Sequence, residues 1–133
     1  MAFFLVDHAA FYRARDAYKG KTYFDAVIPS DARCYLNTAA NEGFAICSNR
    51  FVCSFFNAGP RRSRRQQIAT IQEIYDLGGR HSACYDGPLL RYYTGLGAIE
   101  GRRKEFDHPL GWDKQDGTPD IVQIIWLSRP SVD

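Results

Sequence analysis

The sequence predicts an α/β fold with a partly parallel sheet. Its second half alternates strand and helix patterns, which is typical of a partly parallel sheet. The run Ile121–Leu127 is nearly all apolar and is expected to be a strand that is central or covered on both faces. A length of 133 residues with 45% apolar residues favours one packed domain, residues 1–133.

The first half of the chain supplies patterns for two helices and three strands. Apolar residues at helical spacing predict a helix over His8–Tyr18 that ends at Gly20. Ser30 or Asp31 is expected to cap a second helix that runs to about Asn41, with Gly43 just beyond it. The three predicted strands are Tyr23–Ile28, Gly43–Cys47 and Arg50–Phe56, the last two joined by a tight turn at Ser48-Asn49.

The second half begins at the break Gly59-Pro60. Isoleucines and other apolar residues at three- and four-residue spacing predict a helix over Arg61–Leu77, which Gly78-Gly79 ends. The later elements are expected to be short and to alternate until the last two strands. They are a strand at Arg80–Tyr85, a helix at Pro88–Leu96, and strands at Ala98–Phe106 and Ile121–Leu127.

Composition excludes several classes of protein. No apolar run approaches the roughly 20 residues that span a bilayer, and the N-terminus lacks the basic region of a secretory signal, so we expect a cytoplasmic protein without membrane contact. The four cysteines form no Cys-x-x-Cys pair and are interpreted as buried reduced thiols, not metal ligands. The net charge is only +2, but Arg61, Arg62, Arg64 and Arg65 cluster at the predicted helix start, where they would attract phosphate.

The order of these elements resembles the GNAT superfamily of acetyl-CoA-dependent acyltransferases, roughly over residues 43–127. The resemblance implies a three-layer α/β fold with a mixed central sheet and helices on both of its faces. In this resemblance Arg50–Asn57 is the splayed central strand, Arg61–Leu77 is the helix that grips the cofactor pyrophosphate, and Leu89–Ala98 is the family's Leu-x-x-x-Tyr-x-x-x-Gly-Phe segment. The segment from Gly78 onward is most similar to small GNAT-like proteins of bacteriophage genomes, which would place the protein in a host cytoplasm. The family's phosphate-binding glycines are missing after Pro60, and Ala98 replaces the usual phenylalanine.

The resemblance implies a set of site residues for transfer of an acetyl group from acetyl-CoA to an amine. Backbone N–H groups near Phe55, Phe56 and Asn57 would polarise the thioester carbonyl. Tyr93, four residues before Gly97, would donate a proton to the leaving thiolate, because the ordinary pKa of tyrosine is close to that of a thiol. The cofactor phosphates would be bound by the cluster at the helix start, which comprises Arg61, Arg62, Arg64, Arg65 and Gln66.

The general base is left open by the sequence. Asp86 is the first candidate, although it could instead cap the helix that begins at Pro88. Glu42 and His81 are further candidates, and their alternatives are a solvated helix-end residue and an interior histidine. His108 and Trp112 could stack on an acceptor, but Trp112 is better interpreted as the anchor of a loop.

The sequence is compatible with three functions. The first is an N-acetyltransferase whose acceptor is an amine on a small molecule, a protein or a modified nucleobase. The second is a GNAT-shaped protein that has lost catalysis and binds a host protein or nucleic acid, for example against a defence system. The third is nucleic-acid binding through Arg61–Arg65. An exposed edge strand could also pair two copies as a homodimer.

Overall fold

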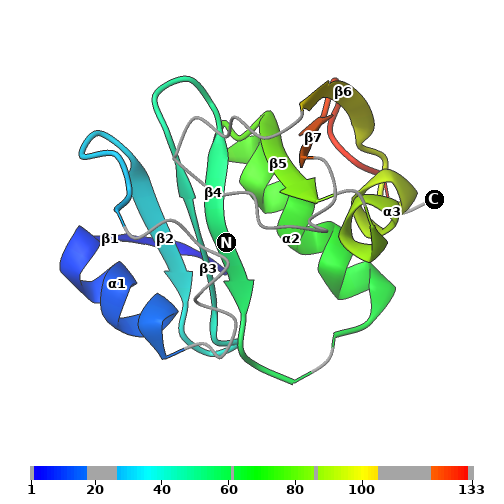
Figure 1. Cartoon of the computed structure of the whole chain (residues 1–133). Coiled ribbons are helices and arrows are strands. Elements are labelled where there is room, and N and C mark those ends of the chain that lie inside the picture. The colour runs from blue at the N-terminus through cyan, green and yellow to red at the C-terminus, as the bar shows by residue number, and fades with distance from the viewer. Residues whose placement is uncertain (1, 18–26, 61, 86, 105–120, 132–133) are drawn as a thin grey trace. The chain divides into compact units, whose positions relative to one another are not determined.

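The computed structural model describes residues 2–17, 27–60, 62–85, 87–104 and 121–131. These residues belong to two compact units, 1–64 and 65–133. Figure 1 shows their helices and strands. Both units combine strands with helices, so the predicted α/β class is confirmed. The expectation of a single domain stays a prediction.

The first unit is a four-stranded antiparallel sheet with a helix. Its strands are β1 (Phe4–Val6), β2 (Arg33–Asn37), β3 (Glu42–Ile46) and β4 (Val52–Asn57), and they pair in chain order. Helix α1 (His8–Asp16) packs on β2 and β3, and the Asp7 carboxylate caps it by accepting from the Ala10 N–H at 2.7 Å. The predicted first helix and the predicted hairpin of β3 and β4 are confirmed.

The predicted helix from Ser30 or Asp31 to Asn41 is wrong, because β2 occupies its centre. Residues 34–37 are all buried, so the strand shows no alternation of apolar and polar residues that would have identified it. Ser30 and Asp31 lie in a turn closed by the Ala32 N–H donating to the Pro29 carbonyl at 3.0 Å. Strand β1 was not predicted at all, and the predicted strand Tyr23–Ile28 lies mostly outside the described residues.

Aromatic rings fill both faces of this sheet. On one face Phe44 is fully buried and contacts the rings of Phe3, Tyr35 and Phe55, with centroids 4.8, 5.3 and 6.3 Å away. On the other face Phe56 contacts Phe11 of α1 at 5.8 Å. Gly43 lies beside Phe56 on β3, where an added Cβ would come within 2.6 Å of the Phe56 ring. The absence of a side chain at residue 43 therefore makes room for the ring.

The second unit contains two helices and a three-stranded antiparallel sheet. Helix α2 (Arg64–Asp76) is followed by β5 (His81–Tyr85), α3 (Pro88–Gly95), β6 (Ile99–Lys104) and β7 (Ile121–Ile125). Strand β7 lies between β5 and β6, so the prediction that the last apolar run is a central strand is confirmed.

The two strands joined by α3 run in the same direction, as a strand-helix-strand crossover requires. Both are antiparallel to β7, which separates them, so they do not pair with each other. Every pairing among the described strands is antiparallel, and one mixed sheet with helices on both faces stays a prediction.

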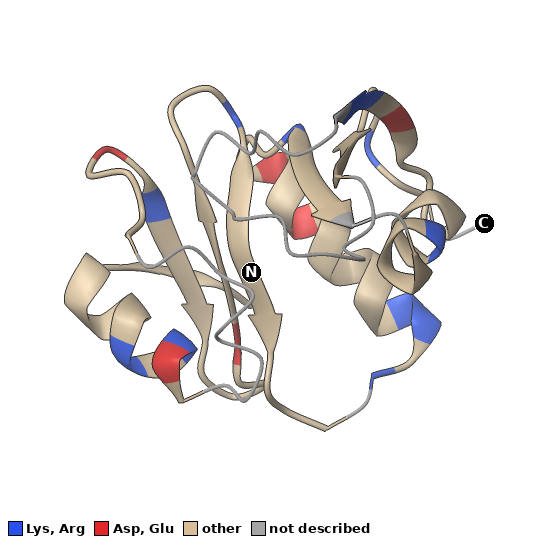
Figure 2. Cartoon of the chain, in the orientation of Figure 1, with Lys and Arg blue, Asp and Glu red and all other residues tan. Residues whose placement is uncertain are grey.

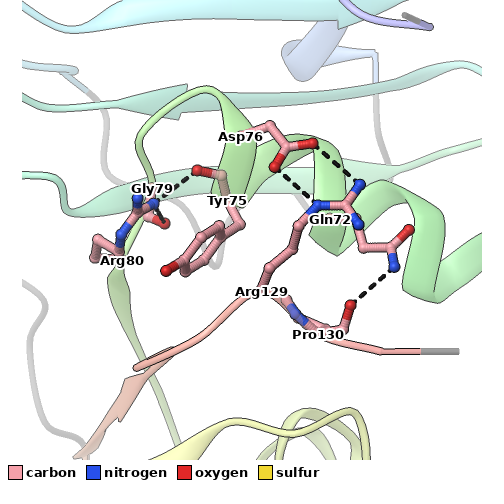
Figure 3. A network of polar contacts seen from close by, with 7 residues as sticks. All are labelled: Gln72, Tyr75, Asp76, Gly79, Arg80, Arg129 and Pro130. Atoms are coloured by element: carbon pink, nitrogen blue, oxygen red, sulfur yellow. Dashed lines mark hydrogen bonds and ion pairs between the residues drawn. The ribbon is translucent and has the colours of Figure 1, made fainter. Parts of the chain in front are cut away.

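The end of α2 and the segment after β7 are held together by polar contacts (Figure 3). Asp76 accepts two hydrogen bonds from the Arg129 guanidinium, at 2.9 and 3.1 Å, and Gln72 donates to the Pro130 carbonyl at 2.8 Å. The Arg80 guanidinium donates to the Tyr75 carbonyl at 2.6 Å and stacks on its ring. Arginine near a helix C-terminus satisfies the last carbonyl groups and complements the helix dipole.

Within the described part of the chain, none of the helices combines the length and apolar character needed to cross a membrane.

Candidate functional site

Strand β4 carries a bulge at Ser54 and Phe55, and Phe55 is the first of the residues predicted to dock the cofactor. Gly43 pairs with Phe56 and Ala45 with Cys53, so Ser54 and Phe55 together lie opposite Phe44 alone. Ser54 has φ +53°, in the left-handed region that non-glycine residues seldom adopt. Bulges bend a strand and disturb the pattern of its backbone hydrogen bonds, and they are common beside active sites.

A buried arginine from α1 holds this bulge. The Arg15 side chain is 5% exposed, and its Nη1 donates to the Ser54 hydroxyl at 3.2 Å. Its guanidinium also lies 4.8 Å from the centre of the Tyr12 ring and 3.3 Å from the Asp16 carboxylate. A buried cation with these partners fixes the position of the strained residue in β4.

The predicted docking residues around the bulge lie in different environments. Phe56 is 2% exposed and Phe55 is half-buried, and both rings pack in the aromatic core. Asn57 is exposed, and its side-chain amide is bonded at both ends. Its Nδ2 donates to Glu42 at 3.4 Å, and its Oδ1 accepts from the Gly59 N–H at 2.9 Å. Any contact of Phe55 and Phe56 with a ligand would therefore be made mainly by their backbone, which is the role predicted from the sequence.

The arginines near the start of α2 differ in exposure. Arg64, Arg65 and Gln66 are exposed in the first turn of the helix, which contains no acidic residue (Figure 2). Arginines at a helix N-terminus are repelled by the positive end of the helix dipole. When an anion binds there, the arginines and the helix dipole both attract it. Arg61 lies outside the described residues.

Arg62 forms an ion pair with Glu42 on β3. The interpretation of Glu42 as a solvated helix-end residue is wrong, because its side chain is 3% exposed and lies in a strand. The error follows from the false helix over residues 31–41. The register next to the hairpin turn would pair Glu42 with Phe56, and the bulge at Ser54 and Phe55 shifts it by one residue so that Glu42 pairs with Asn57. Because the bulge leaves no local pattern, the sequence gives no signal for the contacts of Glu42 with Arg62 and Asn57.

The segment between β4 and Arg62 lies close to the turn between β2 and β3. The Ala58 N–H donates to the Asn41 carbonyl at 2.9 Å, and a Cβ at residue 59 would lie 2.2 Å from the Ala40 carbonyl oxygen. Gly59 is therefore required by the close approach of two backbones. This glycine was interpreted only as a chain break in the sequence.

Tyr93 lies in the last turn of α3 and is half-buried. Its ring is perpendicular to that of Trp126, with centroids 5.8 Å apart, and contacts Tyr92 at 5.3 Å. Trp126 is 4% exposed, and its indole N–H has no hydrogen-bond partner within the described ranges. The packing against Trp126 fixes the ring of the proposed proton donor in one orientation.

The spacing from Tyr93 to Gly97 is that of a Schellman cap. The Ala98 N–H donates to the Tyr93 carbonyl at 3.1 Å, the Gly97 N–H donates to the Thr94 carbonyl at 3.1 Å, and Gly97 has φ +105°. Helix α2 ends in the same way, with φ +109° at Gly78. Part of the Tyr-x-x-x-Gly pattern is therefore explained by the way the helix ends.

Replacing Gly97 by Ala is expected to lower the free energy of unfolding by about 1–2 kcal/mol, because an L side chain at this φ is strained. Gly95→Ala is the matched control, since its Cβ meets no atom within 4 Å and residue 95 is helical. Urea denaturation should show the control unchanged or more stable than the parent. Equal midpoints for the two variants would contradict the cap.

The remaining predicted residues are not brought together by the structure. Asp86, His108 and Trp112 lie outside the described residues. His81 is half-buried on β5, where it pairs with Ile125 of β7. No general base is therefore identified among the described residues, and Asp86 stays a prediction.

All four cysteines are buried and free, as predicted. Cys47 and Cys53 have their sulfur atoms 3.9 Å apart. Burial, with a smaller contribution from Cys47, raises the pKa of the Cys34 thiol to about 11, although the nearby Arg15 acts in the opposite direction. No group of metal ligands is found in the described part of the chain.

The raised pKa of Cys34 predicts a dependence of stability on alkaline pH. Because the unfolded thiol ionises near pH 9 and the folded one near 11, the contribution is complete below pH 9 and declines as pH rises to 11. The full loss is about 2–3 kcal/mol in the free energy of unfolding. Urea titrations of the parent and Cys34→Ala from pH 7 to 11 should show a shallower decline in the variant. Parallel curves would contradict the shift.

In comparisons with models of protein families, with curated proteins and with solved structures, no match to this chain was found.

Proposed function

We propose that this chain is an N-acetyltransferase of the GNAT type that transfers an acetyl group from acetyl-CoA to an amine. The observation that carries the proposal is the bulge at Ser54–Phe55 in β4, followed along the chain by the arginine-rich start of α2. A bulged strand exposes backbone groups to a ligand, and a basic helix start favours phosphate. The three-layer arrangement around one mixed sheet belongs to the same proposal.

Acetyl-CoA would supply an activated acyl group and a thiolate leaving group. The acceptor amine forms a bond to the acetyl carbon while the carbon–sulfur bond breaks. Backbone N–H groups at Phe55–Asn57 would stabilise negative charge on the acetyl oxygen, and Tyr93 would give its proton to the departing sulfur. The proton lost by the amine would pass to Asp86 or to water.

Two features beyond the resemblance support this reading. Arg15 on α1 donates a hydrogen bond to Ser54 and so holds the bulge, which fixes the docking strand before any ligand arrives. Arg64 and Arg65 are exposed at the start of α2, and the first turn of this helix contains no acidic residue. Both features are typical of a preorganised site for a ligand that carries phosphate.

The proposal is tested by thermal unfolding with increasing acetyl-CoA, with free CoA and ATP as comparisons. A ligand that binds only the folded state raises Tm by mass action, here by about 10 °C at a hundredfold excess over Kd. Both CoA species should raise Tm and ATP should not. No shift at millimolar acetyl-CoA would overturn the proposal.

A second candidate is a GNAT-like protein without catalysis that acts by binding a host protein or nucleic acid. The ion pair of Arg62 with Glu42 favours it, because one of the predicted phosphate ligands is already engaged. This ion pair and the missing glycines after Pro60 both lower the affinity expected for the cofactor phosphates. Capture of a defined partner without any shift by acetyl-CoA would favour this candidate, and salt-sensitive binding of DNA or RNA would identify nucleic acid as that partner.

A further inference from the structure

Glu42, Asn57 and Arg62 form a polar cluster, named here the junction cluster, where β4 ends and the connection to α2 begins. The two oxygens of the Glu42 carboxylate have different partners: Oε1 accepts from Arg62, and Oε2 accepts from Asn57 Nδ2 at 3.4 Å. The hairpin register places Glu42 directly opposite Asn57. The carboxylate is thus bonded to the end of β4 and to the residue two positions before α2.

The cluster continues into the backbone of the connection. Asn57 Oδ1 accepts from the Gly59 N–H, and the Ala58 N–H donates to the Asn41 carbonyl. Gly59 also lies against the Ala40 carbonyl, at a distance that leaves no room for a side chain. Residues 57–59 are therefore held by hydrogen bonds, and Arg62 fixes the far end of the same connection to Glu42.

Burial indicates that Arg62 stays with Glu42 when a ligand binds. The Glu42 side chain is 3% exposed and that of Arg62 is 18% exposed. Moving Arg62 to a ligand would leave the buried carboxylate with Asn57 as its one remaining donor among the described residues, and a poorly paired buried charge is strongly unfavourable. A contact between arginine and an exposed phosphate gains less than this loss, because solvent screens it.

We propose that Glu42 and Arg62 are positioning residues, which hold the connection between β4 and α2 so that Arg64 and Arg65 can bind the phosphate groups of the ligand. Arg62 is thereby removed from the predicted phosphate ligands. This inference rests on the proposed function for the identity of the ligand, acetyl-CoA. The anchoring of the connection by Glu42 stands on the geometry alone.

The ligand test compares acetyl-CoA affinity in Arg62→Met, Glu42→Gln and Arg65→Met over a range of KCl concentrations. Loss of a direct phosphate contact should weaken binding about tenfold and flatten the dependence of log Kd on log salt. Arg65→Met should show this flattening. Arg62→Met and Glu42→Gln should each weaken binding with the parent's salt dependence, and the double variant should bind no more weakly than either one.

A flattened salt dependence in Arg62→Met, with tighter binding in Glu42→Gln, would overturn the proposal. That result would make Arg62 a phosphate ligand for which Glu42 competes. Arg62→Lys should restore most of the affinity in the proposed arrangement, because it keeps a cation beside the carboxylate.

A second experiment needs no ligand and separates failure of this inference from failure of the proposed function. Trypsin cleaves after arginine, and the connection is followed by Arg64 and Arg65. Glu42→Gln should raise the rate of cleavage at residues 61–65 at least fivefold, because cleavage requires local opening. Glu100→Gln, which breaks the exposed pair with Arg103, is the control and should match the parent. Equal rates in both variants would overturn the anchoring role even if acetyl-CoA binds.

Discussion

Replacing Tyr93 by Phe is expected to lower the turnover number for acetyl transfer about a hundredfold or more, while Kd for acetyl-CoA stays within twofold. Proton donation by a positioned side chain contributes about 10²–10⁴ in rate, and Phe removes only the hydroxyl. The ring contact with Trp126 can be kept, so the fold of α3 should be preserved. Release of free thiol from acetyl-CoA, with a panel of amine acceptors, measures this turnover.

Tyr92→Phe is the matched control for this prediction. It removes a hydroxyl from the neighbouring residue of the same helix, whose ring contacts that of Tyr93 at 5.3 Å. The control should keep turnover within about threefold of the parent, since no role in proton transfer is proposed for Tyr92. Equal turnover in the parent and Tyr93→Phe, with an acceptor in hand, would remove Tyr93 from the mechanism.

The sequence predicts most clearly those elements whose pattern arises from their own residues. Ile68, Ile71 and Ile74 recur at helical spacing because one face of α2 is buried, and glycine with positive φ ends the helix at Gly78. Strand β2 could not be predicted from such a pattern, because its buried residues follow one another without alternation. Its strand character comes from pairing with β3, which is tertiary and leaves little local trace.

The candidate site was predictable to a smaller extent. The arginines at the start of α2 are visible in the sequence, but the engagement of Arg62 depends on a residue twenty positions earlier. The bulge in β4 was missed for a related reason: Ser54 has no sequence signature for φ +53°, and its partner Arg15 lies on a different element. Long-range contacts of this kind require a known strand register before they can be inferred.

The largest effect on stability is expected at Phe44. Replacing it by Ala should lower the free energy of unfolding by about 3–5 kcal/mol, because a fully buried aromatic side chain is lost and the cavity collapses only in part. Its ring contacts Phe3, Tyr35 and Phe55, so few neighbours can move inward without breaking other contacts. Urea denaturation followed by far-UV circular dichroism measures the change.

Phe4→Ala is the control, because the Phe4 side chain is 67% exposed and its truncation should cost less than about 0.5 kcal/mol. Similar losses in the two variants would contradict the burial of Phe44. Phe44 also lies opposite the bulge formed by Ser54 and Phe55. The smaller change Phe44→Leu should therefore weaken acetyl-CoA binding even under conditions in which the variant is fully folded. The same ring would then stabilise the first unit and fix the strand on which the proposed cofactor docks.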